Sequence, residues 1–341
     1  MTFDQIIIGQ GLAGTCLAWQ LTWAGQSVCL IDRDEPVTSS KVAAGLITPI
    51  TGRRLVTPPN WLDLWNTACQ FYRHVEQITG QTFLHRGSAI RLFRSPSEAQ
   101  PQNPGAQSSG LMLAPLDNST PFDRPDGGFV MSPAGRLDVP GFLRVSRQRA
   151  VSDERLICAD VDPVSDFQVT PTEVSLPRLG LAARQLIFCR GDADRLNPWF
   201  PCLPWLSAKG ELLTLRMPGY EEPRAVHARV WLAPGPQGLY RLGATYDSRQ
   251  LDQQTTPAAR EFLLTALREF WQSPVEVTDQ QAAVRPAFHD QQPRIIQHAE
   301  VPSLWMLNGL GSKGSLLAPT WAQHTTQRLL GTSWCLADAS P

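Results

Sequence analysis

The chain has 341 residues, a length that suits two domains of ordinary size. Its 30 lysines and arginines are balanced by 31 acidic residues, so the net charge is -1, and this excludes the strongly basic surface of a typical nucleic-acid-binding protein. No apolar run approaches the roughly 18 residues of a membrane span. The N-terminus carries no cationic segment followed by an apolar stretch, so we expect a cytoplasmic protein without a signal peptide.

The cysteines, histidines and lysines limit the chemistry further. The seven cysteines form no C-x-x-C pair, and most lie in apolar sequence, so we expect reduced, buried thiols. The six histidines show no metal-ligand spacing, and we expect no metal. Only Lys41, Lys209 and Lys313 are lysines among the 30 cations. Codon bias in a GC-rich genome would explain why lysines are rare, but not where these three lie.

A glycine-rich turn near the N-terminus gives the clearest signal. An apolar run at residues 5–8 predicts a buried strand, and residues 13–24 predict a helix. Between them lies Gly9-Gln10-Gly11-Leu12-Ala13-Gly14, and a second predicted strand at residues 28–31 ends in Asp32. Strand, glycine turn, helix, strand and acid form the context in which G-x-G-x-x-G predicts dinucleotide binding.

Each glycine of this turn has its own task. Gly9 permits the tight turn, Gly11 lets the backbone approach a pyrophosphate, and Gly14 allows the helix to pack closely on the strand. The N–H groups and the dipole at the helix N-terminus favour the phosphate charge. Asp32 is placed to accept hydrogen bonds from ribose hydroxyls.

The remaining pattern predicts an α/β protein with two kinds of sheet. Helices are predicted at residues 60–77, 137–150, 257–271 and 315–330, and strands at 111–113, 128–131, 155–161, 167–170, 173–176, 185–189, 211–217, 229–232, 239–244, 275–284 and 304–307. Units of strand, helix and strand at both ends predict a parallel, Rossmann-like nucleotide-binding sheet, while the middle strands predict a mixed or antiparallel sheet. We therefore expect a discontinuous nucleotide-binding domain (residues 1–80, 130–200 and 281–341) and an inserted substrate domain (residues 81–129 and 201–280).

Two further segments are rich in small residues. Residues 39–49 allow close approach to a flat or charged ligand, although an ordinary tight loop explains them equally well. Residues 307–314 precede the predicted terminal helix and form a second backbone nest for an anion or dipole. Two such nests suit an extended ligand with two polar regions.

Taken in order, these motifs resemble those of the D-amino-acid oxidase and glycine oxidase family of FAD-dependent oxidoreductases. The matching segments are Gly9-Gln10-Gly11-Leu12-Ala13-Gly14 with Asp32, Ser39-Ser40 with Ala43-Ala44-Gly45, Lys209-Gly210-Glu211, Leu242-Gly243-Ala244-Thr245, Arg285-Pro286, and residues 309–314 continuing into Leu316-Leu317-Ala318-Pro319. They span nearly the whole chain. The resemblance implies that the nucleotide-binding domain binds FAD, and no cysteine lies in the C-terminal loop, so we expect it to be non-covalent.

The resemblance also implies a set of site residues. FAD would be bound by Gly9, Gly11, Leu12, Ala13, Gly14, Asp32, Arg33, Ser39, Ser40, Ala43, Ala44, Gly45, Leu46, Val161, Cys189, Gly191, Arg285, Gly309, Gly311, Ser312, Lys313 and Gly314. Arg285 would bind the substrate carboxylate, with a structural salt bridge as the alternative. Tyr240 and Tyr246 would line the substrate pocket or simply pack, and Lys313 would reach the flavin edge or point to solvent.

Three positions depart from the family pattern. Glycine-oxidase-like members carry an arginine where this chain has Ser312. Cys189-Arg190-Gly191 replaces the usual Ala-Thr-Gly, and Arg190 would contact a phosphate or be exposed. Arg53 and Arg54 would bind an acidic or phosphorylated substrate or form a solvated surface pair.

The resemblance implies oxidation of a small amine or amino acid by hydride transfer to FAD, giving an imine that hydrolyses, with oxygen or another compound as electron acceptor. An NAD(P)-linked dehydrogenase, a tRNA-modifying FAD oxidoreductase and a non-catalytic flavoprotein that acts as a binding module remain alternatives. We expect no nucleic-acid or membrane partner, and a homo-oligomer is compatible with the sequence.

Overall fold

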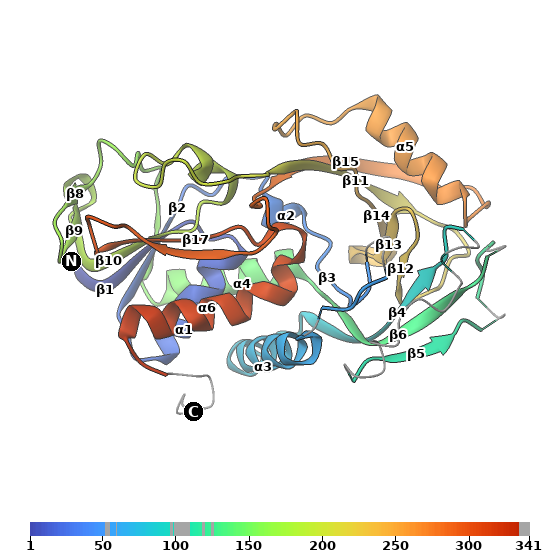
Figure 1. The fold of residues 1–341 in the computed structure, drawn as a ribbon, viewed down its shortest axis with the longest axis horizontal. Coiled ribbons are helices and arrows are strands. Elements are labelled where there is room, and N and C mark those ends of the chain that lie inside the picture. The colour runs from blue at the N-terminus through green and yellow to red at the C-terminus, as the bar shows by residue number, and fades with distance from the viewer. Residues whose placement is uncertain are drawn as a thin grey trace.

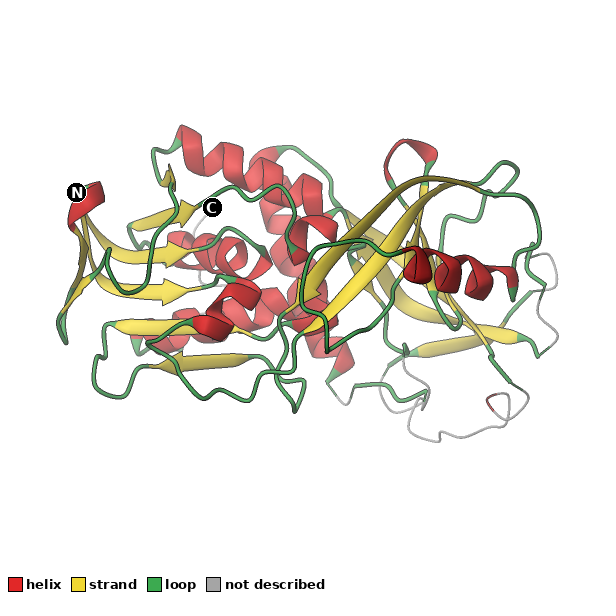
Figure 2. Cartoon of the chain, turned by 90° about the horizontal axis from the view of Figure 1, so that it is seen from above, coloured by secondary structure: helices red, strands yellow, loops and turns green. Residues whose placement is uncertain are grey.

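Two sheets, packed side by side, form the molecule in a computed structural model (Figure 1). The structure describes residues 1–51, 55–58, 60–95, 98, 110–117, 120–123 and 126–333. Seen from above, the strands of the first sheet run toward the junction with the second sheet (Figure 2). The junction is where the segments far apart in the sequence meet.

The first sheet contains the predicted parallel strands. Its order is β16-β17-β10-β1-β2-β7, and β9 and β8 extend it from β10. The strands are β1 (Thr2–Ile8), β2 (Val28–Asp32), β7 (Leu156–Cys158), β8 (Gln168–Val169), β9 (Val174–Leu176), β10 (Leu181–Phe188), β16 (Arg294–Gln297) and β17 (Leu304–Asn308). The pairs β1–β2, β1–β10, β10–β17 and β2–β7 are parallel. Their carboxyl ends therefore lie along one edge.

Strand alternation gives this sheet a separate core on each face. Ile7 packs with the helices α1 (Leu12–Trp23), α3 (Trp61–Thr79), α4 (Val139–Ser152) and α6 (Gly314–Leu330). Ile6 and Ile8 point to the opposite face and pack with Phe188 and Phe200. Side chains of successive strand residues alternate between faces, so a fully apolar strand must be covered on both sides.

The second sheet is mostly antiparallel. Its order is β15-β11-β14-β13-β12-β4-β6-β3, with β5 paired to β6. The strands are β3 (Leu46–Ile47), β4 (Leu84–Leu92), β5 (Met112–Pro115), β6 (Gly128–Leu137), β11 (Ala208–Arg216), β12 (Ala225–His227), β13 (Trp231–Pro234), β14 (Tyr240–Gly243) and β15 (Glu276–Arg285). Among these neighbours only β4 and β12 run parallel. The α/β class, with a Rossmann-like sheet joined to a mixed sheet, is confirmed.

The outer face of the second sheet packs on α5 (Pro257–Arg268), which Figure 1 shows beside β11 and β15. Leu213, Leu232 and Leu242 pack there with Leu263 of the helix. The Thr256 side chain begins the helix because its Oγ1 accepts a hydrogen bond from the Ala259 N–H at 3.2 Å. The opposite face of the sheet is thereby left for the junction.

The sheets divide the chain at somewhat different points from those expected. β6 stays in the second sheet to Leu137, whereas the sequence places residues from 130 onward in the nucleotide-binding domain. β15 likewise stays in the second sheet to Arg285, beyond the expected boundary at residue 280. Both strands run into the junction, so their last residues lie beside the first domain although their backbones pair in the second sheet.

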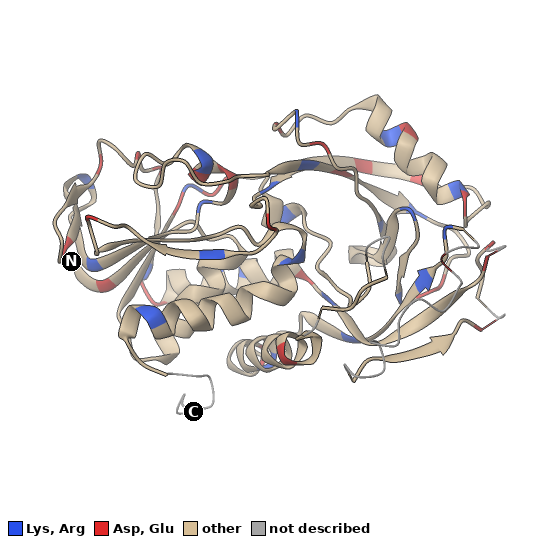
Figure 3. Ribbon diagram, viewed as in Figure 1, with Lys and Arg blue, Asp and Glu red and all other residues tan. Residues whose placement is uncertain are grey.

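Charges and thiols are distributed over the whole described chain. Acidic and basic positions are interspersed over both sheets (Figure 3). Cys16, Cys29, Cys69 and Cys189 are buried as expected, but burial was wrongly expected for Cys158, at the end of edge strand β7, and for Cys202, in a turn. Cys335 lies outside the described residues.

In the described parts of the chain no helix is long and apolar enough to cross a membrane, and no metal-binding group of side chains occurs.

Candidate functional site

A cavity of about 470 Å³ lies at the carboxyl ends of the parallel strands and extends beneath the second sheet. Residues of the turn after β1, the end of β2, the loop after β10 and the loop after β17 line one part. Gly210, Leu212, Trp231 and Ala283 of the second sheet line the other. Crevices at the carboxyl ends of such strands are where ligands bind in open α/β sheets.

The glycine turn after β1 allows very close packing. Gly9 has φ +104°, and a Cβ there would lie 2.5 Å from the Cys189 carbonyl oxygen. A Cβ on Gly14 would lie 1.9 Å from the Gly9 carbonyl oxygen, so Gly14 brings α1 against the turn although it does not itself line the cavity. Gly9, Gly11, Leu12 and Ala13 do line it. The N-terminus of α1 therefore opens on the cavity.

Asp32 is held in place at the end of β2. Its carboxylate accepts hydrogen bonds from the N–H groups of Gln10 and Asp34, both at 2.8 Å. Arg147 of α4 donates from Nη1 to Oδ1 of the same carboxylate at 3.3 Å, the oxygen that also accepts the Asp34 N–H, and it also contacts the Asp34 carboxylate. Arg147 was not predicted, because nothing in its helix marks it. The neighbouring Arg33 lines the cavity and pairs with Glu35.

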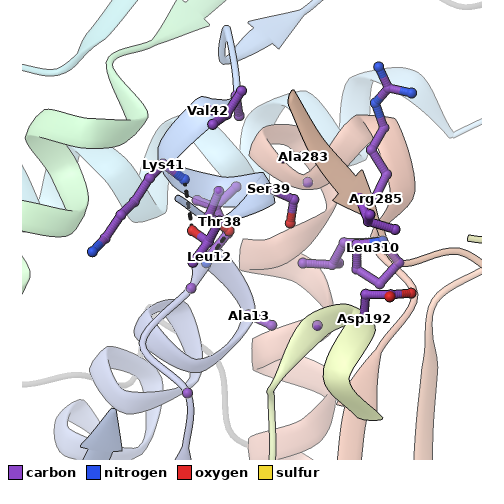
Figure 4. A pocket seen from close by; sticks show the side chains of 18 of the residues that line it. Leu12, Ala13, Thr38, Ser39, Lys41, Val42, Asp192, Ala283, Arg285 and Leu310 are labelled. Carbon is purple, nitrogen blue, oxygen red and sulfur yellow. Dashed lines mark hydrogen bonds between the residues drawn. The ribbon is translucent and has the colours of Figure 1, made fainter. Parts of the chain in front are cut away.

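The segment after β2 crosses the cavity as the short helix α2 (Ser39–Val42). The Ser40 hydroxyl accepts a hydrogen bond from the Leu12 N–H at 3.1 Å, which joins this segment to the N-terminus of α1. The Lys41 amine turns away, bonding Asp34 at 3.0 Å and the Glu35 carbonyl at 2.7 Å. Figure 4 shows Thr38, Ser39 and Lys41 opposite Ala283 and Arg285 across the pocket.

The predicted small residues beyond α2 also lie at the cavity. Ala43, Ala44, Gly45 and Leu46 line it together with Ser39 and Ser40. Gly45 has φ +73°, and a Cβ there would lie 1.8 Å from the Leu137 carbonyl oxygen. A side chain at this position is therefore excluded both by backbone conformation and by space.

On the far side, a buried carboxylate fixes the loop after β10. Asp194 accepts hydrogen bonds from the Arg190 N–H at 2.9 Å, from Asn197 at 3.2 Å and from the Asn308 side chain at 2.9 Å. Burial raises the pKa of Asp194 to about 6. This network was not predicted, because its members come from separate segments. It positions Gly191, which lines the cavity together with the predicted Val161 and Cys189.

The second nest follows β17. Gly311, Ser312 and Gly314 line the cavity at the N-terminus of α6, whereas Gly309, at φ +85°, packs against Phe288 and does not. Lys313 is exposed and does not line the cavity. Its backbone N–H donates to the Leu310 carbonyl at 3.3 Å, but its side chain makes no hydrogen bond or ion pair within the described chain. Partial desolvation lowers the pKa of Lys313.

Arg285, at the end of β15, lines the cavity beneath the second sheet. Its guanidinium covers Gly210, where a Cβ would lie 1.8 Å from Nη2, and Nη2 donates to the Thr245 carbonyl at 3.2 Å. Desolvation lowers the pKa of Arg285. Among the described residues no carboxylate pairs with it, so the expected alternative of a salt bridge is absent there. A mostly buried, unpaired guanidinium facing a cavity is suited to an anionic ligand.

Two predicted tyrosines lie elsewhere. Tyr240 donates its hydroxyl hydrogen to the Tyr220 carbonyl at 3.0 Å and packs against the Tyr220 ring, and Tyr246 is exposed; neither lines the cavity. Arg190 lines the site, and its backbone N–H donates to Asp194. Arg53 and Arg54 lie outside the described residues.

Comparisons with known proteins agree with this geometry. The family model described as FAD dependent oxidoreductase matches residues 4–328. A putative thiamine biosynthesis oxidoreductase ThiO from Rhizobium etli is 26% identical over 344 residues, which cover 95% of this chain and 96% of that protein.

Solved structures share the whole fold. Glycine oxidase from Geobacillus kaustophilus and iminodiacetate oxidase from Chelativorans sp. BNC1 each superpose with a TM-score of 0.80, at 19% and 18% identity, over 99% of this chain and 98% of theirs. L-proline dehydrogenase from P.horikoshii superposes with a TM-score of 0.80 at 12% identity, over 96% of this chain and 93% of its own. The chain therefore belongs to the family of FAD-dependent oxidoreductases, and its cofactor is FAD.

Proposed function

We propose that this FAD-dependent oxidoreductase oxidises a small amine or amino acid that carries a carboxylate. The Arg285 guanidinium carries the proposal, because it lines the cavity beneath the second sheet without a carboxylate partner among the described residues, and this supports binding of an anionic group. The names of the relatives support it, since glycine, iminodiacetate and L-proline are all amines with carboxylates. The family assignment alone would not restrict the substrate in this way.

The residues at the first sheet fit FAD. A Cβ on Gly11 would lie 3.1 Å from the Ser40 hydroxyl, so glycine keeps this part of the cradle open. Gly9, Gly11, Leu12 and Ala13 at the N-terminus of α1 would hold the diphosphate, and Asp32 the ribose hydroxyls. Ser39, Ser40, residues 43–46 and the nest at residues 311–314 would hold the remainder without a covalent bond. Gly14 and Gly309 would act by allowing the surrounding segments to pack.

The chain would contribute mainly binding and alignment. When bound, FAD supplies the hydride acceptor, its N5 atom. Arg285 would hold the substrate carboxylate by charge-assisted hydrogen bonds and so fix the carbon that bears nitrogen. Loss of hydride from that carbon and of a proton from nitrogen leaves an imine, which water hydrolyses to a carbonyl compound and an amine or ammonia. The electrons then pass to oxygen or another acceptor.

An anaerobic experiment tests the proposal with matched compounds. Sarcosine and dimethylamine differ only in the carboxylate, and the same comparison can be made between D-alanine and ethylamine. We expect the carboxylated member of at least one such pair to bleach the oxidised flavin band and its partner to have no effect. Bleaching by both members at equal rates would contradict the carboxylate requirement.

Arg285→Met tests the assigned residue. Loss of a charge-assisted pair should weaken binding of the carboxylated amine by about 10- to 100-fold. FAD affinity, measured by titrating the flavin-free protein, should change far less. Comparable losses for substrate and FAD would show that Arg285 maintains the cofactor site rather than the substrate.

A further inference from the structure

Arg147 of α4 connects the glycine turn after β1 with the end of β2. Its Nη1 atom donates to the Gln10 side-chain oxygen at 3.1 Å and to Asp32 Oδ1 at 3.3 Å. Its Nη2 atom lies 3.3 Å from Oδ2 of Asp34. The planar guanidinium carries several N–H donors in a fixed fork, so one side chain can bond partners from two segments. Arg147 thus links two segments that line the first-sheet part of the cavity.

The buried Gln10 side chain is held in the orientation that this link requires. Its Nε2 atom donates to the Leu143 carbonyl oxygen of α4 at 3.0 Å, which leaves its Oε1 atom to accept from Arg147. The Gln10 backbone N–H donates to Asp32 Oδ2 at 2.8 Å. Gln10, Arg147 and Asp32 therefore form a closed ring of hydrogen bonds, and the orientation of the Asp32 carboxylate depends on both partners.

The hydrogen bonds to Asp32 leave little room for a ligand on its carboxylate. A carboxylate oxygen accepts about two hydrogen bonds. Oδ1 already accepts the Asp34 N–H at 2.8 Å and the Arg147 Nη1 at 3.3 Å. Among the described residues Oδ2 accepts only the Gln10 N–H. Asp32 lines the cavity whereas Arg147 and Asp34 do not, so the remaining position on Oδ2 is the one available to a ligand.

We propose that Arg147 is a positioning residue for the cofactor, which fills one oxygen of the Asp32 carboxylate and so limits Asp32 to one hydroxyl of the adenosine ribose. This inference rests on the proposed function, in which Asp32 binds the ribose. Asp32 would accept that hydroxyl on Oδ2, and the second hydroxyl would find no free acceptor on this carboxylate. Because a hydrogen bond to a charged group is stronger than one between neutral groups, the two hydroxyls would contribute unequally to FAD affinity.

FAD analogues that lack one hydroxyl of the adenosine ribose test this inequality without requiring oxidation of a substrate. The flavin-free full-length chain would be titrated with FAD, with its 2′-deoxyadenosine analogue and with its 3′-deoxyadenosine analogue, and flavin fluorescence would report binding. We expect one analogue to bind at least about tenfold more weakly than FAD and the other to bind within about threefold of FAD. Equal losses for both analogues, or no loss for either, would overturn the proposal.

Substitution of Arg147 tests whether this residue causes the inequality. Arg147→Met removes a donor from Oδ1 and opens an acceptor position there, so the affinities of the two analogues should come within about threefold of each other. A merely structural role would weaken FAD and both analogues by the same factor, and that unchanged ratio would refute the proposal. Arg144→Met, at an exposed position of the same helix, should keep the wild-type ratio, and an equal change there would also refute it. The wild-type comparison needs no variant, so it decides the matter even if Arg147→Met does not fold.

Asp32→Asn separates this proposal from the assignment on which it rests. That variant should weaken FAD binding by about tenfold or more. If neither this variant nor the loss of a ribose hydroxyl weakens binding, the assignment of Asp32 to the ribose fails. If Asp32→Asn weakens FAD binding but the two analogues lose affinity equally, only the role of Arg147 fails. The substrate part of the proposed function is tested separately at Arg285.

Discussion

The buried carboxyl of Asp194 provides a quantitative test of how the cavity is held together. Its side chain is 0% exposed and connects the loop after β10 with Asn308 at the end of β17. Burial raises its pKa from 3.8 to about 6, although the charge of Arg190 and the hydrogen bonds from Arg190, Asn197 and Asn308 oppose the shift. The raised pKa means that the folded state binds this proton more tightly than the unfolded state does.

The sign and size of the effect follow from proton linkage. Stability from Asp194 is fully present below the unfolded pKa of 3.8 and is lost as the pH rises through the folded pKa of about 6. A shift of about two pKa units corresponds to about 3 kcal/mol in all, of which about 2 kcal/mol is lost between pH 4 and pH 7. Asp194→Asn has no such proton, so raising the pH from 4 to 7 should lower the free energy of unfolding of the wild type by about 2 kcal/mol more than that of the variant.

Urea unfolding of both proteins at a series of pH values, with FAD at one fixed saturating concentration, measures this difference. Other titrating groups are common to both proteins and cancel in the comparison. Asn at this position loses part of the hydrogen-bond network, so Asp194→Asn should be the less stable protein at pH 4. A stability difference that stays constant from pH 4 to pH 7 would refute the raised pKa of Asp194.

Two further predictions concern the walls of the cavity. Gly45→Ala places a Cβ 1.8 Å from the Leu137 carbonyl oxygen, so we expect the free energy of unfolding in urea to fall by about 3 kcal/mol or more and FAD to bind more weakly. The control Gly180→Ala is also at positive φ but has open space around it, and it should cost about 1 kcal/mol. Equal losses in the two variants would contradict the steric argument. Tyr72→Phe removes the 2.8 Å hydrogen bond from a buried hydroxyl to the Ser315 carbonyl at the start of α6. This loss should lower the free energy of unfolding by about 1–3 kcal/mol in the same assay. The control Tyr246→Phe, at an exposed position, should change it by less than about 0.5 kcal/mol.

Local sequence was sufficient where one continuous segment does the work. Gly9, Gly11 and Gly14 lie between a buried strand and a helix, and this order alone predicts a turn that brings backbone N–H groups to a dinucleotide. The nest before α6 was likewise expected from its own glycines, whereas the small residues from Ala43 to Gly45 were assigned to the site only by the family resemblance, because a tight loop explains them equally well.

Features that depend on contacts between distant segments were harder to predict from the sequence. β4 was not predicted, since Leu84–Leu92 mixes charged residues, glycine and apolar residues, and only its pairing with β6 and β12 defines it. Lys41 lies in a predicted cofactor loop, yet its amine is drawn away by Asp34 and the Glu35 carbonyl. Side-chain direction depends on the available partners, and these are not apparent from the order of residues.

The sequence by itself therefore determined the α/β class, the two backbone nests and the position of Arg285 at the end of an extended segment. Only the tertiary structure decided that Arg285 has no carboxylate partner among the described residues and that Asp194 joins two loops. The physical reason is that a glycine turn is specified by local backbone conformation, whereas burial and charge pairing depend on which distant segments the fold brings together.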